Sequence, residues 1–376
     1  MQYKEYELGE LLPFEQPTAY IVKSTDYSDA YATPVLTAGK SFILGKTNET
    51  DGVFDQLPVI IFDDFTTATQ FVNFRFKVKS SAMKILHINT DLVIPKYIFY
   101  RLQIIQFDHS THKRYWIQSY SKIKVLIPPL DEQSRIVARI EELFSELDKA
   151  VDTLKTTKEQ LVVYRQAVLK EIFDSISTTS VHIKDVCLDI KVGIVIKPTQ
   201  YYVSENGVPA FRNANVRRGY INDTDWVMIS KEGHQQNCRS EVHTNDVLIS
   251  RSGANLGMAS VVPARYNGYN AIDVVIAVPD MSKVIPEFLA QYTNSPMGRA
   301  IVKKNERGAA QGHLNVSAYA NLPIGVPDLQ EQEKLVKQIS DRLSVCDSIE
   351  KTVDTALAQA DAMRQIILKQ AFEGKI

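Results

Sequence analysis

Two short stretches decide how this chain folds: PPLDEQ at residues 128–133 and PDLQEQ at residues 327–332. Starting at these stretches, the segment 128–173 aligns with 327–372 at a constant offset of 199 and without a gap. Sixteen of the 46 aligned positions are identical, including Arg165 and Arg364 near the end of each copy. Gapless identity of about one third over this length indicates an internal repeat.

Both copies have the pattern of a long amphipathic helix that follows a proline and carries acidic residues in its first turn. Apolar residues recur every seven positions, and a second row four residues earlier completes the seam of a coiled coil. A helix of about 43 residues, roughly 64 Å long at 1.5 Å per residue, exceeds the core of one domain, so we expect the helices to pack as a coiled coil. The main rows are Ile140, Leu147, Leu154, Leu161 and Val168 in the first copy, and Ile339, Cys346, Val353, Ala360 and Ile367 in the second.

The segment before each helix is rich in short β-type runs separated by turn residues. The sequence predicts strands at 59–62, 71–76, 246–249 and 273–278. The two segments share landmarks in the same order: PVL at 34–36 and PAF at 209–211, LPVII at 57–61 and NDVLI at 245–249, IPKY at 94–97 and IPEF at 285–288. We therefore expect an α+β fold of two β-rich domains, 1–127 and 177–326, and two helices, 128–176 and 327–376.

Composition and charge are those of a water-soluble protein, and they agree with this division. Of the 376 residues, 44% are hydrophobic and 23% are charged, and no apolar run is long enough to span a bilayer. Three scattered cysteines and no signal peptide predict a reducing cytoplasm. The net charge of −1 divides into −5 on the two helical segments and +4 on the two domains. The small total therefore conceals mildly basic domains.

The candidate catalytic and metal-binding patterns do not match known motifs in spacing or in number of ligands. Residues 39–47, GKSFILGKT, resemble a phosphate-binding loop but have one residue too many between the glycines. His234, Cys238 and His243 lack a fourth zinc ligand. The sequence predicts no catalytic residue and no metal site, and therefore a protein that is not itself an enzyme.

Polar loops of a nucleic-acid-binding type remain in both domains. The stretch 211–220, FRNANVRRGY, combines arginines, asparagines and aromatic residues, and 307–315, RGAAQGHLN, is similarly rich in donors. Arginine reads guanine edges and asparagine reads adenine edges, while lysines hold phosphates. In the first domain, 37–47 and 112–116 take comparable places. The alternative is that these are ordinary solvated loops.

The repeated Pro-x-Leu-x-Glu-Gln motif, each copy leading into a helix that ends in Arg-Gln-x-x-Leu-Lys-x-x-Phe, resembles the specificity subunit of type I restriction–modification systems. The turn from Arg251 to Gly253 and the loop from Gly308 to Asn315 are similar to that family's second domain, whereas the first domain has HKR at 112–114 in place of the latter loop. We take as candidate DNA-binding residues Thr37, Lys40, Ser41, Lys46, Lys113, Arg114, Arg212, Asn213, Asn215, Arg217, Arg251, Gln311, His313 and Asn315.

The resemblance implies two target-recognition domains separated by an antiparallel pair of helices. Each domain would read one half of a bipartite, asymmetric sequence in double-stranded DNA, with an unread gap set by the helices. Two methyltransferase subunits using S-adenosylmethionine would dock on the helices, and restriction–translocase subunits would add cleavage that needs ATP and Mg²⁺, with no cofactor in this chain. The residues implied in methyltransferase docking are Leu130, Glu132, Gln133, Leu329, Glu331 and Gln332.

Two other interpretations stay open on the sequence. One is a coiled-coil adaptor whose β-rich domains bind protein or carbohydrate. The other is the recognition subunit of a system that only methylates. The target sequence does not follow from the loops, since pairing of side chains with bases depends on the docked geometry.

Overall fold

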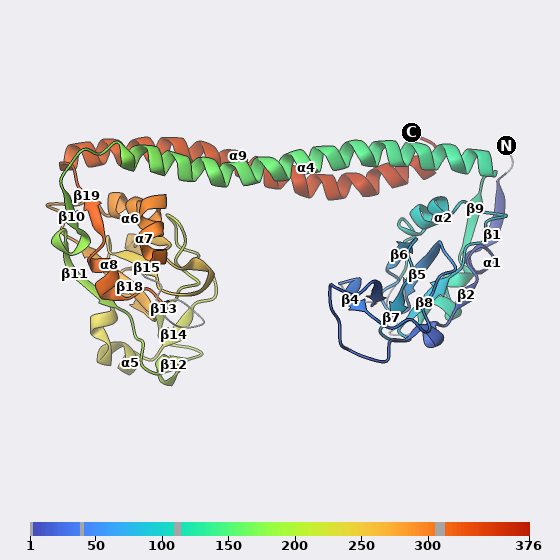
Figure 1. The fold of residues 1–376 in the computed structure, drawn as a ribbon, viewed down its shortest axis with the longest axis horizontal. Helices are drawn as coiled ribbons and strands as arrows, with labels where there is room; N and C mark the ends of the chain where they lie inside the picture. The colour runs from blue at the N-terminus through green and yellow to red at the C-terminus, as the bar shows by residue number, and fades with distance from the viewer. Residues whose placement is uncertain (1–2, 38–40, 109–113, 305–312) are drawn as a thin grey trace. The chain divides into compact units, whose positions relative to one another are not determined.

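The computed structural model describes residues 3–37, 41–108, 114–304 and 313–376. It divides into two compact units: unit 1 is Met1–Leu154 with Asp354–Ile376, and unit 2 is Lys155–Val353. The boundaries fall inside two long helices, α4 (Leu130–Asp174) and α9 (Leu329–Phe372) (Figure 1). Each unit thus combines one β-rich domain with part of both helices. No helix in the described ranges is long and apolar enough to cross a membrane.

The domain of unit 1 is built on a four-stranded sheet of order β2-β8-β5-β6, with a smaller sheet of order β4-β3-β7 and the pair β1-β9. Strands β3 and β7 are parallel, and the other pairs are antiparallel. The elements are β1 (Lys4–Glu7), α1 (Leu8–Leu11), β2 (Phe14–Glu15), β3 (Thr33–Leu36), β4 (Ile43–Thr47), β5 (Val59–Asp63), β6 (Thr69–Val72), β7 (Lys77–Val78), β8 (Met83–Leu86), α2 (Pro95–Leu102), α3 (Tyr115–Gln118) and β9 (Lys124–Ile127).

The domain of unit 2 repeats this topology with additions. Its main sheet has the order β11-β18-β15-β16, its smaller sheet β12-β14-β13-β17, and β10 pairs with β19. The elements are β10 (Ser180–His182), β11 (Cys187–Val192), β12 (Tyr202–Val203), β13 (Val208–Phe211), β14 (Val227–Ile229), α5 (Lys231–Gln236), β15 (Val247–Ser250), β16 (Ala259–Val261), β17 (Asn270–Ala271), β18 (Val274–Pro279), α6 (Pro286–Asn294), α7 (Pro296–Lys304), α8 (Val316–Ala320) and β19 (Pro323–Gly325).

The shared landmarks fall on equivalent elements: 34–36 and 209–211 on β3 and β13, 57–61 and 245–249 on β5 and β15, and 94–97 and 285–288 at the starts of α2 and α6. Strands β5 and β15 lie near the middle of the main sheets and are buried on both faces, which explains their continuous apolar sequence. In β15, Val247 and Ile249 face α6 and the long helices, while Leu248 faces Phe211.

One predicted strand is wrong in its extent. The run 71–76 does not form a single strand, because β6 ends at Val72. Phe76 instead exchanges two backbone hydrogen bonds with Phe54 and stacks on its ring at 4.9 Å. The chain therefore turns between these positions, and the aromatic pair fills the core between β3 and β5.

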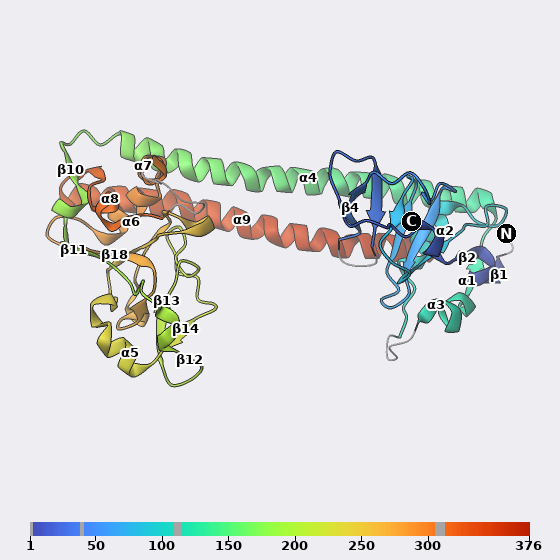
Figure 2. The same ribbon diagram turned by 60° about the horizontal axis from the view of Figure 1, so that its bottom comes forward.

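The long helices pack antiparallel within each unit. In unit 1, Ile140 near the start of α4 contacts Leu368 and Ala371 near the end of α9. In unit 2, Val168 near the end of α4 belongs to the same apolar cluster as Ile339 near the start of α9. Figure 1 and Figure 2 show the two helices side by side. All five residues of the predicted row in α9 are buried, which confirms the coiled-coil seam.

Repeat-related ion pairs join the helices in both units. Arg165 in unit 2 donates from Nη1 to Asp347 at 2.6 Å, and from Nη2 to Glu350 at 2.7 Å. Its repeat counterpart Arg364 in unit 1 bonds Asp148, the counterpart of Asp347. The same contact thus recurs with the helices exchanged, as an antiparallel pair of repeated sequences requires.

A buried glutamine in the first turn of each long helix holds that helix to its domain. In unit 1, the Gln133 amide donates to the carbonyl oxygens of Leu92 (3.0 Å) and Pro128 (2.9 Å) and accepts from the N–H of Ile94 (2.8 Å). Ile94 is the residue that precedes the first turn of α2. The side chain therefore links the start of α4 to the start of α2.

Gln332 makes the same three bonds in unit 2. Its amide donates to the carbonyl oxygens of Lys283 (2.9 Å) and Pro327 (2.8 Å) and accepts from the N–H of Ile285, which precedes α6 (2.9 Å). Gln133 and Gln332 are both 0% exposed. The expectation that these two side chains contact a partner subunit is therefore corrected, because their bonds are made inside their own units.

The substitution Gln332→Leu tests this role. It keeps the side-chain size but leaves the Ile285 N–H and the Lys283 carbonyl buried without a partner. Since each such group costs about 1–3 kcal/mol, we expect unit 2 to lose about 2–4 kcal/mol of unfolding free energy, measured by urea denaturation of the full chain. Gln330→Leu, at an exposed position of the same turn, is the matched control. Equal urea midpoints for the two variants would contradict the assignment.

Candidate functional site

The polar loops selected in the second domain meet around one amide, that of Asn213. Its oxygen accepts from the N–H of Arg251 (2.7 Å) and the hydroxyl of Ser250 (2.9 Å), both at the end of β15. Its amide nitrogen donates to Ser252 Oγ at 2.9 Å. Asn255 in the same turn donates back to the Asn213 carbonyl at 3.0 Å. The loop that follows β13 is thereby joined to the loop that follows β15.

Arg251 joins a third segment to this pair. Its Nε donates to the carbonyl of Leu314 at 2.9 Å, and its backbone carbonyl accepts from the Leu314 N–H at 2.9 Å. Its Nη1 forms an ion pair with Asp273 at 2.8 Å. Asp273, just before β18, has a φ of 52°, in the left-handed region. Arg251 is thus an anchor that brings together three segments selected from the sequence.

Two of the selected asparagines shape these loops and do not present free amides. Asn215 is 0% exposed; its oxygen accepts from the Arg212 N–H, and its nitrogen donates to the carbonyls of Asn222 and Thr224. Asn213 is committed to the contacts described above. Direct reading of a base by Asn215 is therefore corrected: burial leaves it no open face, and its bonds hold the loop 212–224.

The guanidinium groups of the two arginines in the same loop bond only to backbone carbonyls of the described residues. Arg212 donates from Nη2 to the carbonyl of Asp225, and Arg217 lies 3.5 Å and 3.3 Å from the carbonyls of Asn213 and Val216. These partners are neutral carbonyls. Within the described ranges, neither guanidinium forms an ion pair with a carboxylate. Both groups retain the capacity to bind an anion or a base edge.

The first domain has an equivalent anchor with the opposite charge. Asp64 follows β5 as Arg251 follows β15, and its backbone carbonyl accepts from the Tyr115 N–H at 3.0 Å. Its Oδ1 accepts from the Trp116 N–H at 2.8 Å, and its Oδ2 pairs with buried Lys84 at 3.2 Å. Tyr115 thus takes the place that Leu314 takes in unit 2. The sequence search missed this anchor, although the position of Asp64 directly after the aligned strand pointed to it.

The other selected DNA-binding residues lie as follows. Ser41 and Arg114 are exposed, Lys46 on β4 is half-buried, and the Thr37 N–H donates to the Phe42 carbonyl. His313 and Asn315 are exposed, and the Asn315 side chain caps α8 by accepting from the Ser317 N–H. Lys40, Lys113 and Gln311 lie outside the described residues. DNA contact by these positions stays a prediction.

The remaining positions implied in partner docking lie on the first turns of the long helices. Leu130 is exposed and Leu329 is half-buried. Glu132 pairs with Arg135, and Glu331 pairs with Lys334. Both acidic side chains thus form short-range surface pairs of the kind that contribute little to stability. A docking role for these four residues is compatible with their places and stays a prediction.

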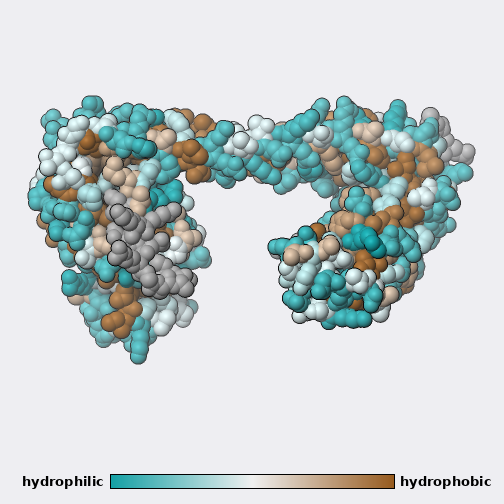
Figure 3. All heavy atoms as spheres, viewed as in Figure 1, coloured by the Kyte–Doolittle hydropathy of each residue, from teal (hydrophilic) through white to brown (hydrophobic). Residues whose placement is uncertain are grey.

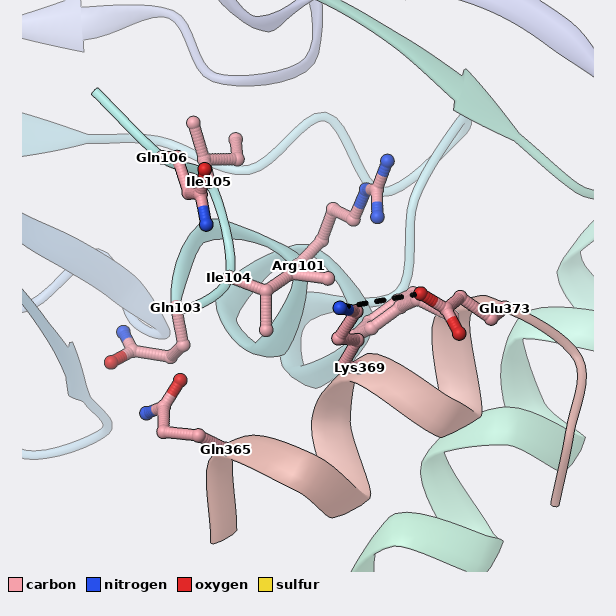
Figure 4. A pocket seen from close by; sticks show the side chains of 9 residues that line it. Arg101, Gln103, Ile104, Ile105, Gln106, Gln365, Lys369 and Glu373 are labelled. Carbon is pink, nitrogen blue, oxygen red and sulfur yellow. Dashed lines mark ion pairs between the residues drawn. The ribbon is translucent and has the colours of Figure 1, made fainter. Parts of the chain in front are cut away.

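A hollow in each unit lies beside repeat-related positions of the long helices. The hollow in unit 1, about 430 Å³, lies between the end of α2 and α9 and includes Gln365 and the ion pair of Lys369 with Glu373 (Figure 4). The hollow in unit 2, about 420 Å³, includes Gln166, the counterpart of Gln365, and Arg218.

Histidines and cysteines in the described ranges do not assemble a metal site. His234 and His243 both face Glu241, at 3.7 Å and 3.6 Å, but no group of three or more His, Cys, Asp or Glu side chains there has the geometry to hold a metal ion. Burial raises the pKa of the Cys187 thiol to about 12. That thiol is therefore protonated and unreactive at neutral pH.

Comparison with known proteins places this architecture in a family. The family model described as the type I restriction modification DNA specificity domain matches residues 2–162 and 168–359. The specificity subunit of the type I restriction enzymes EcoR124I and EcoR124II of Escherichia coli is 31% identical over 95% of this chain and 90% of its own length. The EcoBI specificity subunit of Escherichia coli is 27% identical over 66% of this chain and 58% of its own length.

Solved structures share the fold. A chain from a study of complex assembly and conformational transition of the type I R-M system superposes with a TM-score of 0.70 at 19% identity, covering 100% of this chain and 98% of that one. The HsdS subunit of Thermoanaerobacter tengcongensis gives 0.52 at 18% identity, covering 100% and 97%. With two specificity domains matched and the repeated helices in place, this chain belongs to the family of type I restriction–modification DNA specificity subunits.

Proposed function

We propose that this chain selects the DNA target of a type I restriction–modification complex, with each domain contacting one half of a bipartite, asymmetric sequence. The observation that carries the proposal is the pairing of one topology with two different loop systems. The strand orders of the main sheets match, whereas the anchors are Asp64 with Lys84 in one domain and Arg251 with Asp273 in the other. Related scaffolds that present different loops are suited to reading different half-sites.

The helices supply the gap between the half-sites in this proposal. Each long helix is continuous from one unit into the other, and each is held to a domain by a buried glutamine. A helix of fixed residue count is a spacer of fixed length, since its rise is about 1.5 Å per residue. The unread gap is then set by the number of helical residues.

Catalysis is assigned to partner subunits. Two methyltransferase subunits using S-adenosylmethionine would modify adenine in each half-site, and nuclease–translocase subunits would use ATP and Mg²⁺ to cleave. The long helices offer docking surface for such partners. Figure 3 shows mostly hydrophilic residues on the displayed face of the helices, interrupted by hydrophobic patches. Exposed apolar side chains on the helices of unit 2 are Val162, Val163, Val345 and Ile349.

The proposal predicts that the gap follows helix length. Seven residues inserted after Thr156 and after Thr355, which are equivalent in the repeat, add about 10 Å or roughly three base pairs. We expect the gap of the methylated target to grow by about that number, with both half-sites unchanged. The measurement is co-expression with the methyltransferase, followed by sequencing of methylated adenines. The control inserts seven residues in one helix only, which should abolish methylation. An unchanged gap in the double insertion would contradict the spacer role.

A second prediction concerns the half-site read by the second domain. In Arg212→Gln/Arg217→Gln, we expect altered or lost selectivity for that half-site alone, since each specific contact contributes about 1–3 kcal/mol of discrimination. The methylated sequences of the co-expressed complex report the outcome. The control is Lys231→Gln/Arg239→Gln, which removes two exposed positive charges from the same domain. If selectivity is retained in the arginine variant, these side chains do not read the target.

A further inference from the structure

A tight turn at the end of the stretch 211–220 holds Arg218, which is not among the candidate DNA-binding residues named above. In the turn 217–220, the Arg217 N–H donates to the Tyr220 carbonyl at 3.1 Å. Gly219 has a φ of 78°, which only glycine adopts readily. Its N–H donates to the Ala259 carbonyl at 2.9 Å, so the turn is fastened to β16. Arg218, at the second position of this turn, is exposed at its surface.

The same point on β16 holds the start of α7, which carries Arg299. Asn294 is buried; its oxygen accepts from the Ala259 N–H at 3.0 Å, and its nitrogen donates to the Ala259 carbonyl at 2.8 Å. Ser295 follows, and its carbonyl accepts from the Arg299 N–H at 3.0 Å. One backbone residue, Ala259, therefore fixes both the turn of Arg218 and the helix of Arg299.

The two guanidinium groups lack an ion-pair partner in the part of the chain that the structure describes. Nη1 of Arg299 is enclosed and has no hydrogen-bond partner among the described residues. Neither arginine forms an ion pair within the described ranges. Burial lowers the pKa of both groups, and the nearby charge of Arg218 lowers that of Arg299 further. A part-buried guanidinium with an unpartnered nitrogen is stabilised when an anion binds beside it, and Arg218 is tethered to the same residue, Ala259.

The surroundings include acidic groups, but these are engaged or lie beyond ion-pair distance. Arg218 lines the hollow of about 420 Å³ in unit 2, together with Glu287, Asp347 and Glu350. Asp347 and Glu350 both bond Arg165, and Glu287 makes no ion pair in the described part of the chain. Within the described ranges, the positive charges of Arg218 and Arg299 are therefore not neutralised by an ion pair.

We propose that Arg218 and Arg299 together bind one backbone phosphate of DNA beside the half-site contacted by the second domain. The inference rests on the proposed function. Guanidinium groups bind phosphate oxygens with paired, charge-assisted hydrogen bonds. The turn begins at Arg217 and so ends the loop that starts at Arg212, and Tyr220 in it is 60% exposed. Such a contact positions the domain on the duplex without reading sequence.

The test compares the full complex carrying Arg218→Gln/Arg299→Gln with the parent complex. The probe is a duplex containing the target that methylation sequencing identifies for the parent chain. Loss of one phosphate contact should lower the slope of log affinity against log salt concentration by about 0.9, while the set of methylated sequences stays unchanged. The control Lys231→Gln/Arg239→Gln removes the same charge elsewhere in the domain and should change the slope less.

A second measurement uses duplexes with a single neutral methylphosphonate linkage at each position flanking the half-site. One linkage should weaken binding by the parent complex and leave binding by the arginine double variant unaffected. An unchanged salt slope, an equal slope change in the control, or equal sensitivity of both complexes at every linkage would overturn the proposal.

Other results separate the possible failures. Loss of methyltransferase co-purification with an unchanged slope would assign the arginine pair to a carboxylate of the partner and would also overturn the proposal. Failure of the proposed function itself has a different signature, because the parent complex would then show no sequence-specific methylation.

Discussion

Each repeat depends on three hydrogen bonds made by the side-chain amide of one buried glutamine. Gln133 and Gln332 sit in the first turns of α4 and α9 and bond the chain just before α2 and α6. A coiled-coil seam alone tolerates rotation and sliding of whatever is attached to its ends. An amide whose donors and acceptor are all used, with no exposed surface, permits one attachment. The placement of each set of loops relative to its helix follows from that constraint.

Much of this architecture could be predicted because the sequence contains an internal repeat and a seven-residue apolar period. The repeat located both helices, and the row from Ile339 to Ile367 is buried as the seven-residue spacing required. The aligned landmarks located the central strands β5 and β15 because strands buried on both faces have continuous apolar runs. The Pro-x-Leu-x-Glu-Gln motif was recognised, but its glutamine was assigned to a partner surface. Sequence does not reveal burial when a polar side chain finds its partners inside the fold.

The role of individual loop residues could be predicted only in part, for a related reason. Arg, Asn and Gly residues suit both a binding surface and an internal hydrogen-bond network, and composition does not separate the two. Asn215 and Arg251 belong to the network, because their partners come from residues 3 to 63 positions away. Arg218 lies in the stretch 211–220 but was not a candidate residue, and only the fold tethers its turn and the start of the Arg299 helix to the same residue, Ala259. Such pairings depend on tertiary contacts with no local periodicity.

The reversed polarity of the two anchors has a consequence for modular exchange. In unit 1, an acid at the end of the central strand is neutralised by Lys84; in unit 2, a base at that place is neutralised by Asp273. A loop system moved into unit 1 without an acid at the position of Asp64 leaves the buried charge of Lys84 unmatched, whereas the pair in unit 2 is partly exposed. Chimaeras that carry the strand, its anchor and the counter-ion as one cassette should fold, whereas grafts of loops alone should not. The anchor and its counter-ion therefore belong to one structural unit in each domain.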